Sequence, residues 1–132
     1  MNITRNVHQL TIGLGALALA AACVQVRAMD YHVATAQQLQ NALTLAAANG
    51  ANNNIYITNG YYIGNFNYNS TAATSLTISN EPGIANTQIT IDGAGGGRAL
   101  SITSSGTSAI TVAGLTFSRN CGNTACYSGQ FA

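Results

Sequence analysis

Two short segments of this chain return at the same fixed offset, and this repeat constrains the fold more than any single residue does. Residues 55–59 (IYITN) return as residues 76–80 (LTISN), and residues 89–93 (ITIDG) return as residues 110–114 (ITVAG), an offset of 21 in both cases. Each copy alternates apolar and polar residues and ends in a turn-forming residue, as a short β-strand does. A fixed period of roughly 20–50 residues indicates a solenoid, whose repeats bury their apolar faces against one another. We therefore expect an all-β fold, a short parallel β-helix whose period is that offset.

The strand pattern also predicts the core. Four residues end an apolar–polar–apolar strand at the repeating phase and should point inward on stacked turns: Ile57, Ile78, Ile91 and Val112. We expect strands at residues 31–33, 55–58, 61–66, 76–79, 88–92, 99–103, 109–113 and 115–118. Only a little over three turns fit before residue 126, barely enough for a repeat protein, and no C-terminal cap follows. We expect residues 29–132 to be the N-terminal cap and first turns of a longer, truncated β-helix domain.

One amphipathic helix is predicted ahead of the repeats, at about residues 36–48. The hydroxyl of Thr35 can accept a backbone N–H near Gln38, whose side chain can reach back to the start of the helix. Apolar residues recur at helical spacing and form one stripe: Leu39, Ala42, Leu43 and Ala46. Asn49-Gly50 is expected to end the helix, because glycine readily adopts the left-handed backbone conformation found there. Because the open end of a solenoid exposes its core, we expect this helix to be the N-terminal cap.

The N-terminal segment, residues 1–28, has the pattern of a secretory signal peptide. Arg5 lies in a start without acidic residues, residues 10–24 are mostly apolar, and Val26-Arg27-Ala28 fits a cleavage site. We expect a secreted or cell-surface protein, cleaved after Ala28. Two alternatives stay open: an uncleaved membrane anchor, and a lipoprotein anchored at Cys23, because residues 20–23 (AAAC) resemble a lipobox.

The charge of the processed chain excludes one class of partner. Cleavage after Ala28 leaves residues 29–132, with two arginines against three acids, a net charge of −1, and no lysine. Nucleic-acid binding requires a cluster of basic side chains that neutralises phosphates, which two isolated arginines do not form. We expect no nucleic-acid partner.

Two cysteines remain after cleavage, Cys121 and Cys126. An even pair on an exported chain favours a disulfide, which here closes a four-residue loop. Metal binding and a redox pair are the competing interpretations. Two cysteines whose only accompanying histidine is His32 form a poor zinc site, and their spacing is not the two-residue spacing of a redox motif.

These features together resemble the N-terminal region of exported right-handed parallel β-helix proteins, the pectin-lyase-like superfamily, and most closely its non-catalytic surface-protein members. The resemblance is carried by the predicted helix and by the segments IYI (55–57), GYY (60–62), LTI (76–78), ITIDG (89–93), RALSI (98–102) and ITVAGLTF (110–117). It implies a right-handed parallel β-helix and covers nearly all of the processed chain. It says little about activity, because many unrelated functions occupy such a scaffold.

Polysaccharide lyases and hydrolases of this superfamily use clustered carboxylates, and hydrolysis needs two carboxyl groups within about 10 Å. This chain offers Asp30 before the helix, Glu81 in a Pro-Gly turn, and Asp92 in an Asp-Gly turn. None has an acidic neighbour that would build an acid/base pair or a calcium site. We therefore predict no catalytic residue, no metal site and no cofactor, and we interpret His32 as a structural or surface residue.

Two sets of residues are candidates for interactions. Asn59 and Asn80 share a phase of the repeat, so they could stack as a hydrogen-bonded ladder or act as independent turn residues. Four tyrosines could stack against sugar rings: Tyr56, Tyr61, Tyr62 and Tyr68. The strand propensity of tyrosine explains them equally well.

We expect a non-enzymatic exported segment of a bacterial surface or secreted protein that forms a stalk or an adhesive surface. Its partner would be an extracellular polysaccharide or a host surface, and its exposed C-terminal turn would favour self-association. One alternative is the N-terminal part of a polysaccharide lyase or hydrolase whose active site lies beyond residue 132. Another is a secreted carbohydrate-binding module.

Overall fold

The computed structural model describes residues 27–94, 97–106, 109–121 and 126–131. It contains one α-helix, α1 (Ala36–Ala48), and one short 3-10 helix, η1 (Asn86–Gln88). Its strands are β1 (Met29–Val33), β2 (Asn53–Ile57), β3 (Gly60–Ile63), β4 (Phe66–Ser70), β5 (Leu76–Asn80), β6 (Ile89–Asp92), β7 (Leu100–Ser104), β8 (Ile110–Val112), β9 (Leu115–Cys121) and β10 (Cys126–Phe131). None of the described helices is both long and apolar enough to span a bilayer.

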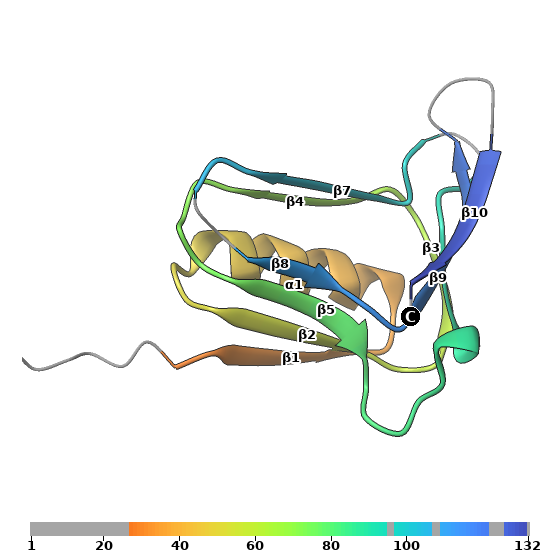
Figure 1. The fold of residues 1–132 in the computed structure, drawn as a ribbon, viewed down its shortest axis with the longest axis horizontal. Coiled ribbons are helices and arrows are strands. Elements are labelled where there is room, and N and C mark those ends of the chain that lie inside the picture. Colours follow the sequence, from red (N-terminus) through yellow and green to blue (C-terminus); the bar gives the residue numbers. More distant parts are fainter. Residues whose placement is uncertain (1–26, 95–96, 107–108, 122–125, 132) are drawn as a thin grey trace, which may run out of the picture.

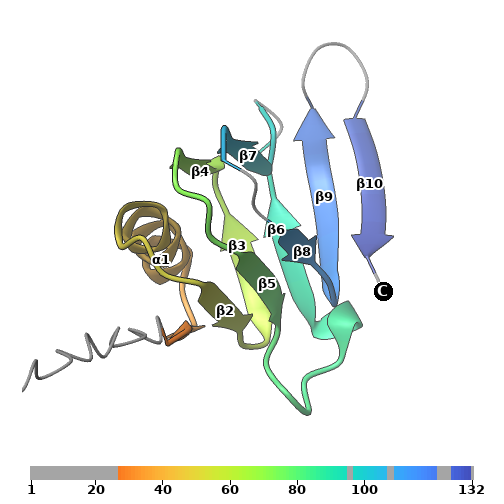
Figure 2. The ribbon, with the colours of Figure 1, turned by 60° about the vertical axis from the view of Figure 1, so that its left-hand side comes forward.

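The strands form three sheets, which we name A, B and C. Sheet A has the order β1-β2-β5-β8, sheet B the order β10-β9-β6-β3, and sheet C pairs β4 with β7. All pairings are parallel except that of β10 with β9. Figure 1 shows the three sheets around a common interior, with α1 beside them. Figure 2 shows α1 at one end of the rows of strands, with β8 and β10 at the other end.

The predicted fold class, an all-β right-handed parallel β-helix with a regular period of 21, is wrong. The described strands lie in three separate sheets, parallel except for β10, with one helix, a mixed α/β arrangement that does not close into a uniform solenoid. The spacing between register partners is not constant, since Ile55 pairs with Ile78 in sheet A, whereas Phe66 pairs with the more distant Leu100 in sheet C. The predicted period fails because the connections differ in length: β6 and β8, two of the matched copies, belong to different sheets.

The prediction for the helix is confirmed in its bounds, its caps and its buried stripe. The hydroxyl of Thr35 accepts the N–H of Gln38 at 3.2 Å, and Oε1 of Gln38 accepts the N–H of Ala34 at 2.8 Å. Gly50 has a φ of 65°, the left-handed conformation that ends a helix. The predicted stripe is buried, and α1 packs against β1, β2, β3 and β4.

The core prediction is confirmed for Ile57, Ile78 and Ile91, which are at most 2% exposed. Val112 is only half-buried, although it packs against the same core. One predicted strand, residues 61–66, is in fact two: β3 ends at Ile63 and β4 begins at Phe66, with the chain passing from sheet B to sheet C between them. The strand β10 was not predicted from the sequence.

Candidate functional site

Sheet A presents a polar outer face. Strand alternation buries Ile55 and Ile57 of β2 and turns their neighbours outward. The register aligns the outward residues of the four strands into two rows. The first row holds Asp30, Asn54, Thr77 and Thr111, and the second holds His32, Tyr56 and Ser79. We call the residues of these two rows the polar face.

Three contacts order the part of the polar face on β1 and β2. The rings of His32 and Tyr56 are stacked, with centroids 5.2 Å apart and planes 29° from parallel. Nδ1 of His32 lies 3.0 Å from Oε1 of Glu81, and the His32 side chain is 58% exposed. In the neighbouring row, Nδ2 of Asn54 donates to Oδ1 of Asp30 at 2.8 Å. An aromatic stack therefore stands beside a carboxylate–amide pair on one surface of the sheet.

The histidine–glutamate contact joins residues that are 49 positions apart. The sequence predicted His32 to be a structural or surface residue and Glu81 to lie in a turn, but it contained no signal that would bring them together. The register of β1 on β2 sets His32 beside Tyr56, and the chain leaving β5 then brings Glu81 to the same edge. Only the alternation within each strand could have marked His32 and Tyr56 as outward residues.

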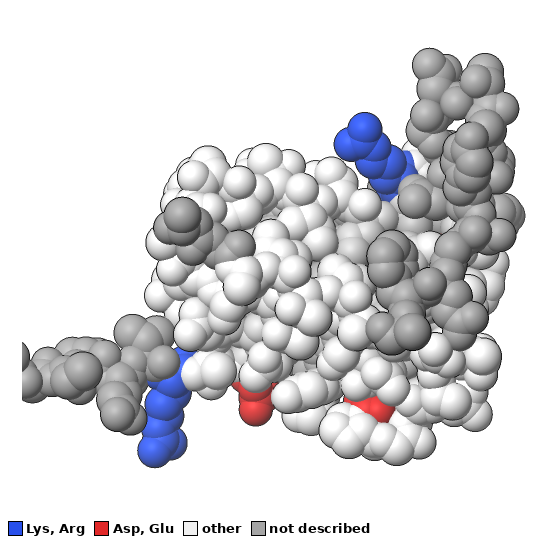
Figure 3. All heavy atoms as spheres, viewed as in Figure 1, with Lys and Arg blue, Asp and Glu red and all other residues white. Residues whose placement is uncertain are grey.

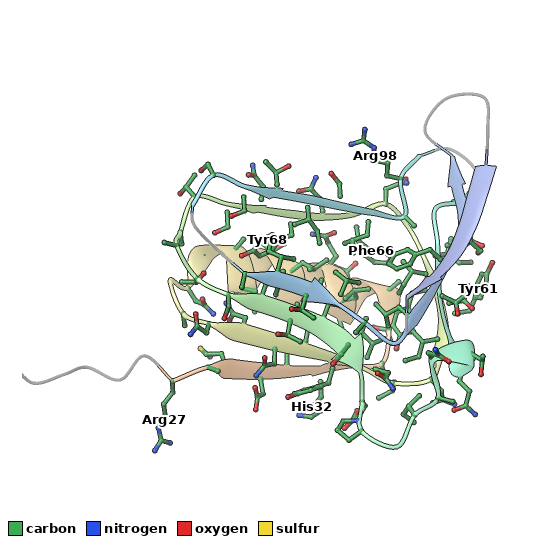
Figure 4. All side chains as sticks on the ribbon, in the orientation of Figure 1. Arg27, His32, Tyr61, Phe66, Tyr68 and Arg98 are labelled. Carbon is green, nitrogen blue, oxygen red and sulfur yellow. The ribbon has the colours of Figure 1, made fainter. Side chains whose placement is uncertain are left out.

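The polar face contains one charged side chain, Asp30, and a second acid, Glu81, lies against His32. Figure 3 shows a mostly uncharged surface with acidic atoms near its lower rim. Figure 4 places His32 at the same lower side, with Arg27 and Arg98 at widely separated corners. Uncharged donors and acceptors therefore dominate the polar face, with Asp30 and Glu81 at its margin.

The structure separates the four predicted tyrosines. Tyr56 lies in the polar face, whereas Tyr61 is 55% exposed on β3 of sheet B. Tyr62 and Tyr68 are each 1% exposed and belong to the core. The hydroxyl of Tyr62 donates toward the carbonyls of Thr58 at 3.0 Å and Val33 at 3.2 Å, which satisfies its polar end inside the protein.

Asp92 is fully buried at the end of β6. Its Oδ2 accepts hydrogen bonds from the Tyr61 hydroxyl and from Oγ of Ser118, the latter at 3.0 Å, and its Oδ1 accepts the N–H of Ala94 at 2.8 Å. Ala94 has a φ of 56°, so the side chain of Asp92 closes the turn that the sequence predicted. The sequence did not reveal the burial of this carboxylate, which ties β3, β6 and β9 together.

The remaining acids lie elsewhere, on or beside sheet A. Across the described residues, no group of three histidine, cysteine, aspartate or glutamate side chains could hold a metal ion.

Asn59 and Asn80, which could have formed a ladder or acted as independent turn residues, are not in register. Asn80 pairs with Ile57, two positions before Asn59. The Nδ2 of Asn80 donates to the carbonyl of Ile84, and its Oδ1 packs closely over Gly114. Asn80 therefore closes its own turn, and the small size of Gly114 leaves room for it.

The backbone places Cys121 and Cys126 opposite each other, where β9 pairs with β10. Their side chains and the loop between them lie outside the described residues. The disulfide stays a prediction.

Comparisons with known protein families, with curated proteins and with solved structures find no match to this chain. The resemblance to the pectin-lyase-like superfamily therefore stays an expectation.

Proposed function

We propose that this chain is a non-enzymatic exported protein that binds an extracellular glycan on the polar face of sheet A. The observation that carries the proposal is the His32–Tyr56 stack beside the Asp30–Asn54 pair. Both pairs lie on neighbouring strands, so a rigid sheet sets their spacing.

The chemistry of sugars fits these groups. A pyranose ring has an apolar C–H face that packs on aromatic rings, and a rim of hydroxyl groups that need donors and acceptors. His32 and Tyr56 supply the rings, Asp30 and Asn54 supply planar acceptors and donors, and the threonine and serine hydroxyls supply both.

The arrangement also suits a polymer. Neighbouring strands are about 4.8 Å apart, so each row repeats a hydrogen-bonding group at that interval across the sheet. A chain of sugars lying across the strands would meet Asp30, Asn54, Thr77 and Thr111 in succession. Because few of these groups are charged, we propose a ligand rich in hydroxyl groups rather than in charge.

The leader supports export. Residues 1–28 have the signal-peptide pattern described above, and β1 begins at Met29, the expected first residue of the processed chain. N-terminal sequencing of the released protein tests this part. A chain that begins with an acylated Cys23 would contradict cleavage after Ala28.

Binding is tested by titrating the purified protein with soluble polysaccharides and by a glycan array. We expect His32→Ala and Tyr56→Ala to weaken binding about tenfold each, since an aromatic contact and its burial are worth on the order of 1–2 kcal/mol. Ile63→Ala, which removes an exposed side chain from sheet B, is the matched control. Equal loss in all three variants, or no binding to any glycan, would contradict the proposed site.

The non-enzymatic part is tested separately with reducing-sugar and unsaturated-uronate assays on the same polysaccharides. We expect no product. Release of unsaturated product would instead support the alternative of a polysaccharide-cleaving enzyme.

A further inference from the structure

β8 ends sheet A with an edge that no other strand of the described residues pairs with. On its inner side, the carbonyl of Ala109 accepts the N–H of Leu76, and the N–H of Ala113 donates to the carbonyl of Ile78, both at 3.0 Å. Backbone groups of successive residues in a strand point to opposite edges. The N–H and C=O groups of Ile110 and Val112 therefore point to the open edge.

The side chains at this edge leave the core partly uncovered. Ile110 and Val112 are half-buried, whereas their register partners on β5, Leu76 and Ile78, are 0% and 1% exposed. The two strands carry the same kinds of residue at the same phase. They differ because β5 has a strand on both sides and β8 has one on a single side.

Two other strand edges, those of β4 and β1, are protected. Gln40 of α1 binds the edge of β4: its Nε2 donates to the carbonyl of Asn67 at 3.1 Å, and its Oε1 accepts the N–H of Asn67 at 3.0 Å. β1, at the opposite edge of sheet A, carries the charged Asp30. Such side-chain plugs and charges oppose strand addition, and β8 has neither charge nor proline.

We propose that β8 pairs antiparallel with β8 of a second copy of this chain, about a two-fold axis at Thr111. The strand Ile110-Thr111-Val112 is symmetric in pattern, apolar–polar–apolar. The axis sets Ile110 opposite Val112 of the second copy, and Thr111 opposite its counterpart. The outward-pointing backbone groups then form the hydrogen-bonded pairs, and the two threonines form the close, non-hydrogen-bonded pair.

The side chains agree with this register. Directly opposed residues of an antiparallel pair share a face, so Ile110 and Val112 of both copies continue the apolar core. The two Thr111 hydroxyls meet on the outer face, a favourable cross-strand pair. An isologous contact needs a surface that complements itself, and an uncharged symmetric strand meets that condition, whereas a charged one would repel its copy. Two four-stranded sheets A would become one sheet of eight strands.

The test places like charges at the two-fold axis. Thr111 is exposed, so we expect Thr111→Lys to leave the fold of one copy unchanged. In the dimer, the two lysine side chains would start from Cβ atoms about 5 Å apart, which brings two positive charges together at the axis. We expect the dimer dissociation constant, from sedimentation at physiological ionic strength, to rise about tenfold or more. The protein is purified with residues 1–28 retained or removed as the expressing cell processes them, and it is not trimmed further.

Thr77→Lys is the matched control, since Thr77 is the outward partner of Thr111 on β5. Its counterpart in the dimer lies three strand spacings away, about 14 Å. That exceeds the Debye length of about 8 Å at physiological salt, so the dissociation constant should change less than about twofold there. A mixture of Thr111→Lys and Thr111→Glu should restore a one-to-one dimer.

Three results would overturn the proposal. They are a wild-type chain that stays monomeric up to its solubility limit, an equal effect of lysine at positions 77 and 111, and no recovery on mixing the two charged variants. The design does not depend on a glycan, so it can fail while the proposed binding function holds.

Discussion

The two ends of the sheets are built from similar residues, but α1 covers one end, whereas the other end has an open strand edge. At the end nearest α1, the helix lays Leu39, Leu43 and their neighbours against the core, and Gln40 occupies the edge of β4. At the other end, β8 presents an open backbone edge and half-buried Ile110 and Val112. The apolar face of a sheet is fully buried only where another element covers it, so the same residue pattern is an interior at one end and a half-buried surface at the other.

The largest expected effect compares one substitution at two stacked positions. Ile78→Asp buries an unpaired carboxylate between β2 and β8 and should cost several kcal/mol, enough to unfold the protein. Val112→Asp at the open edge keeps access to water and should cost markedly less. Thermal melts followed by circular dichroism measure both. Equal melting temperatures would mean that the two positions do not differ in burial as described.

The next prediction concerns the covered end. Leu43→Ala removes a fully buried side chain of α1 and should destabilise the protein by about 2–5 kcal/mol, from lost burial and the cavity left behind. Leu45→Ala, on the same helix but 57% exposed, should change the free energy of unfolding by no more than about 0.5 kcal/mol. Urea titration measures the difference. Similar values for both variants would show that α1 does not cover the core.

Gly114 tests the turn beside β8. It has a φ of 67°, and a side chain there would collide with the amide of Asn80. Gly114→Ala should therefore cost about 1–3 kcal/mol, from backbone strain and displacement of Asn80. Gly83→Ala, also at positive φ but with open space around it, isolates the contribution of strain alone. If both variants lose the same stability, the contact with Asn80 carries none of the effect.

An effect no larger than that at Gly114 is expected at Gln40. Gln40→Ala removes two hydrogen bonds to the edge of β4, and each such bond contributes about 0.5–1.5 kcal/mol. Gln37 lies one turn away and donates a hydrogen bond to Asn41 within the helix. Gln37→Ala is therefore the control for the change in helix propensity and for the loss of an exposed amide. Beyond stability, Gln40→Ala should make association stronger, because it exposes an edge that the native side chain blocks. Unchanged association would limit its role to local packing.

Local features were predictable because their causes are local. The start of α1 depends on Thr35 and Gln38, which are close neighbours in the chain, and its buried stripe follows from helical spacing. Strand alternation likewise marked Ile57, Ile78 and Ile91 as inward residues, whichever strands they paired with.

The site was harder to predict from the sequence, since one of its contacts joins His32 to a residue 49 positions away. The burial of Asp92 was equally hidden, because its donors Tyr61 and Ser118 come from other strands. Contacts of this kind depend on the register between strands, which no local pattern records.

The sequence by itself determined the inward direction of Ile57, Ile78 and Ile91 and where the helix begins and ends, but it gave neither the turn between β3 and β4 nor the burial of Tyr62 and Tyr68. Only the tertiary structure decided which strands are neighbours. The copies ITI at 89–91 and ITV at 110–112 look alike, yet the first lies in sheet B and the second in sheet A. The physical reason is that alternation specifies a face but not a partner. Partners depend on where connections of unequal length return the chain, and on which edge is still open when the next strand arrives.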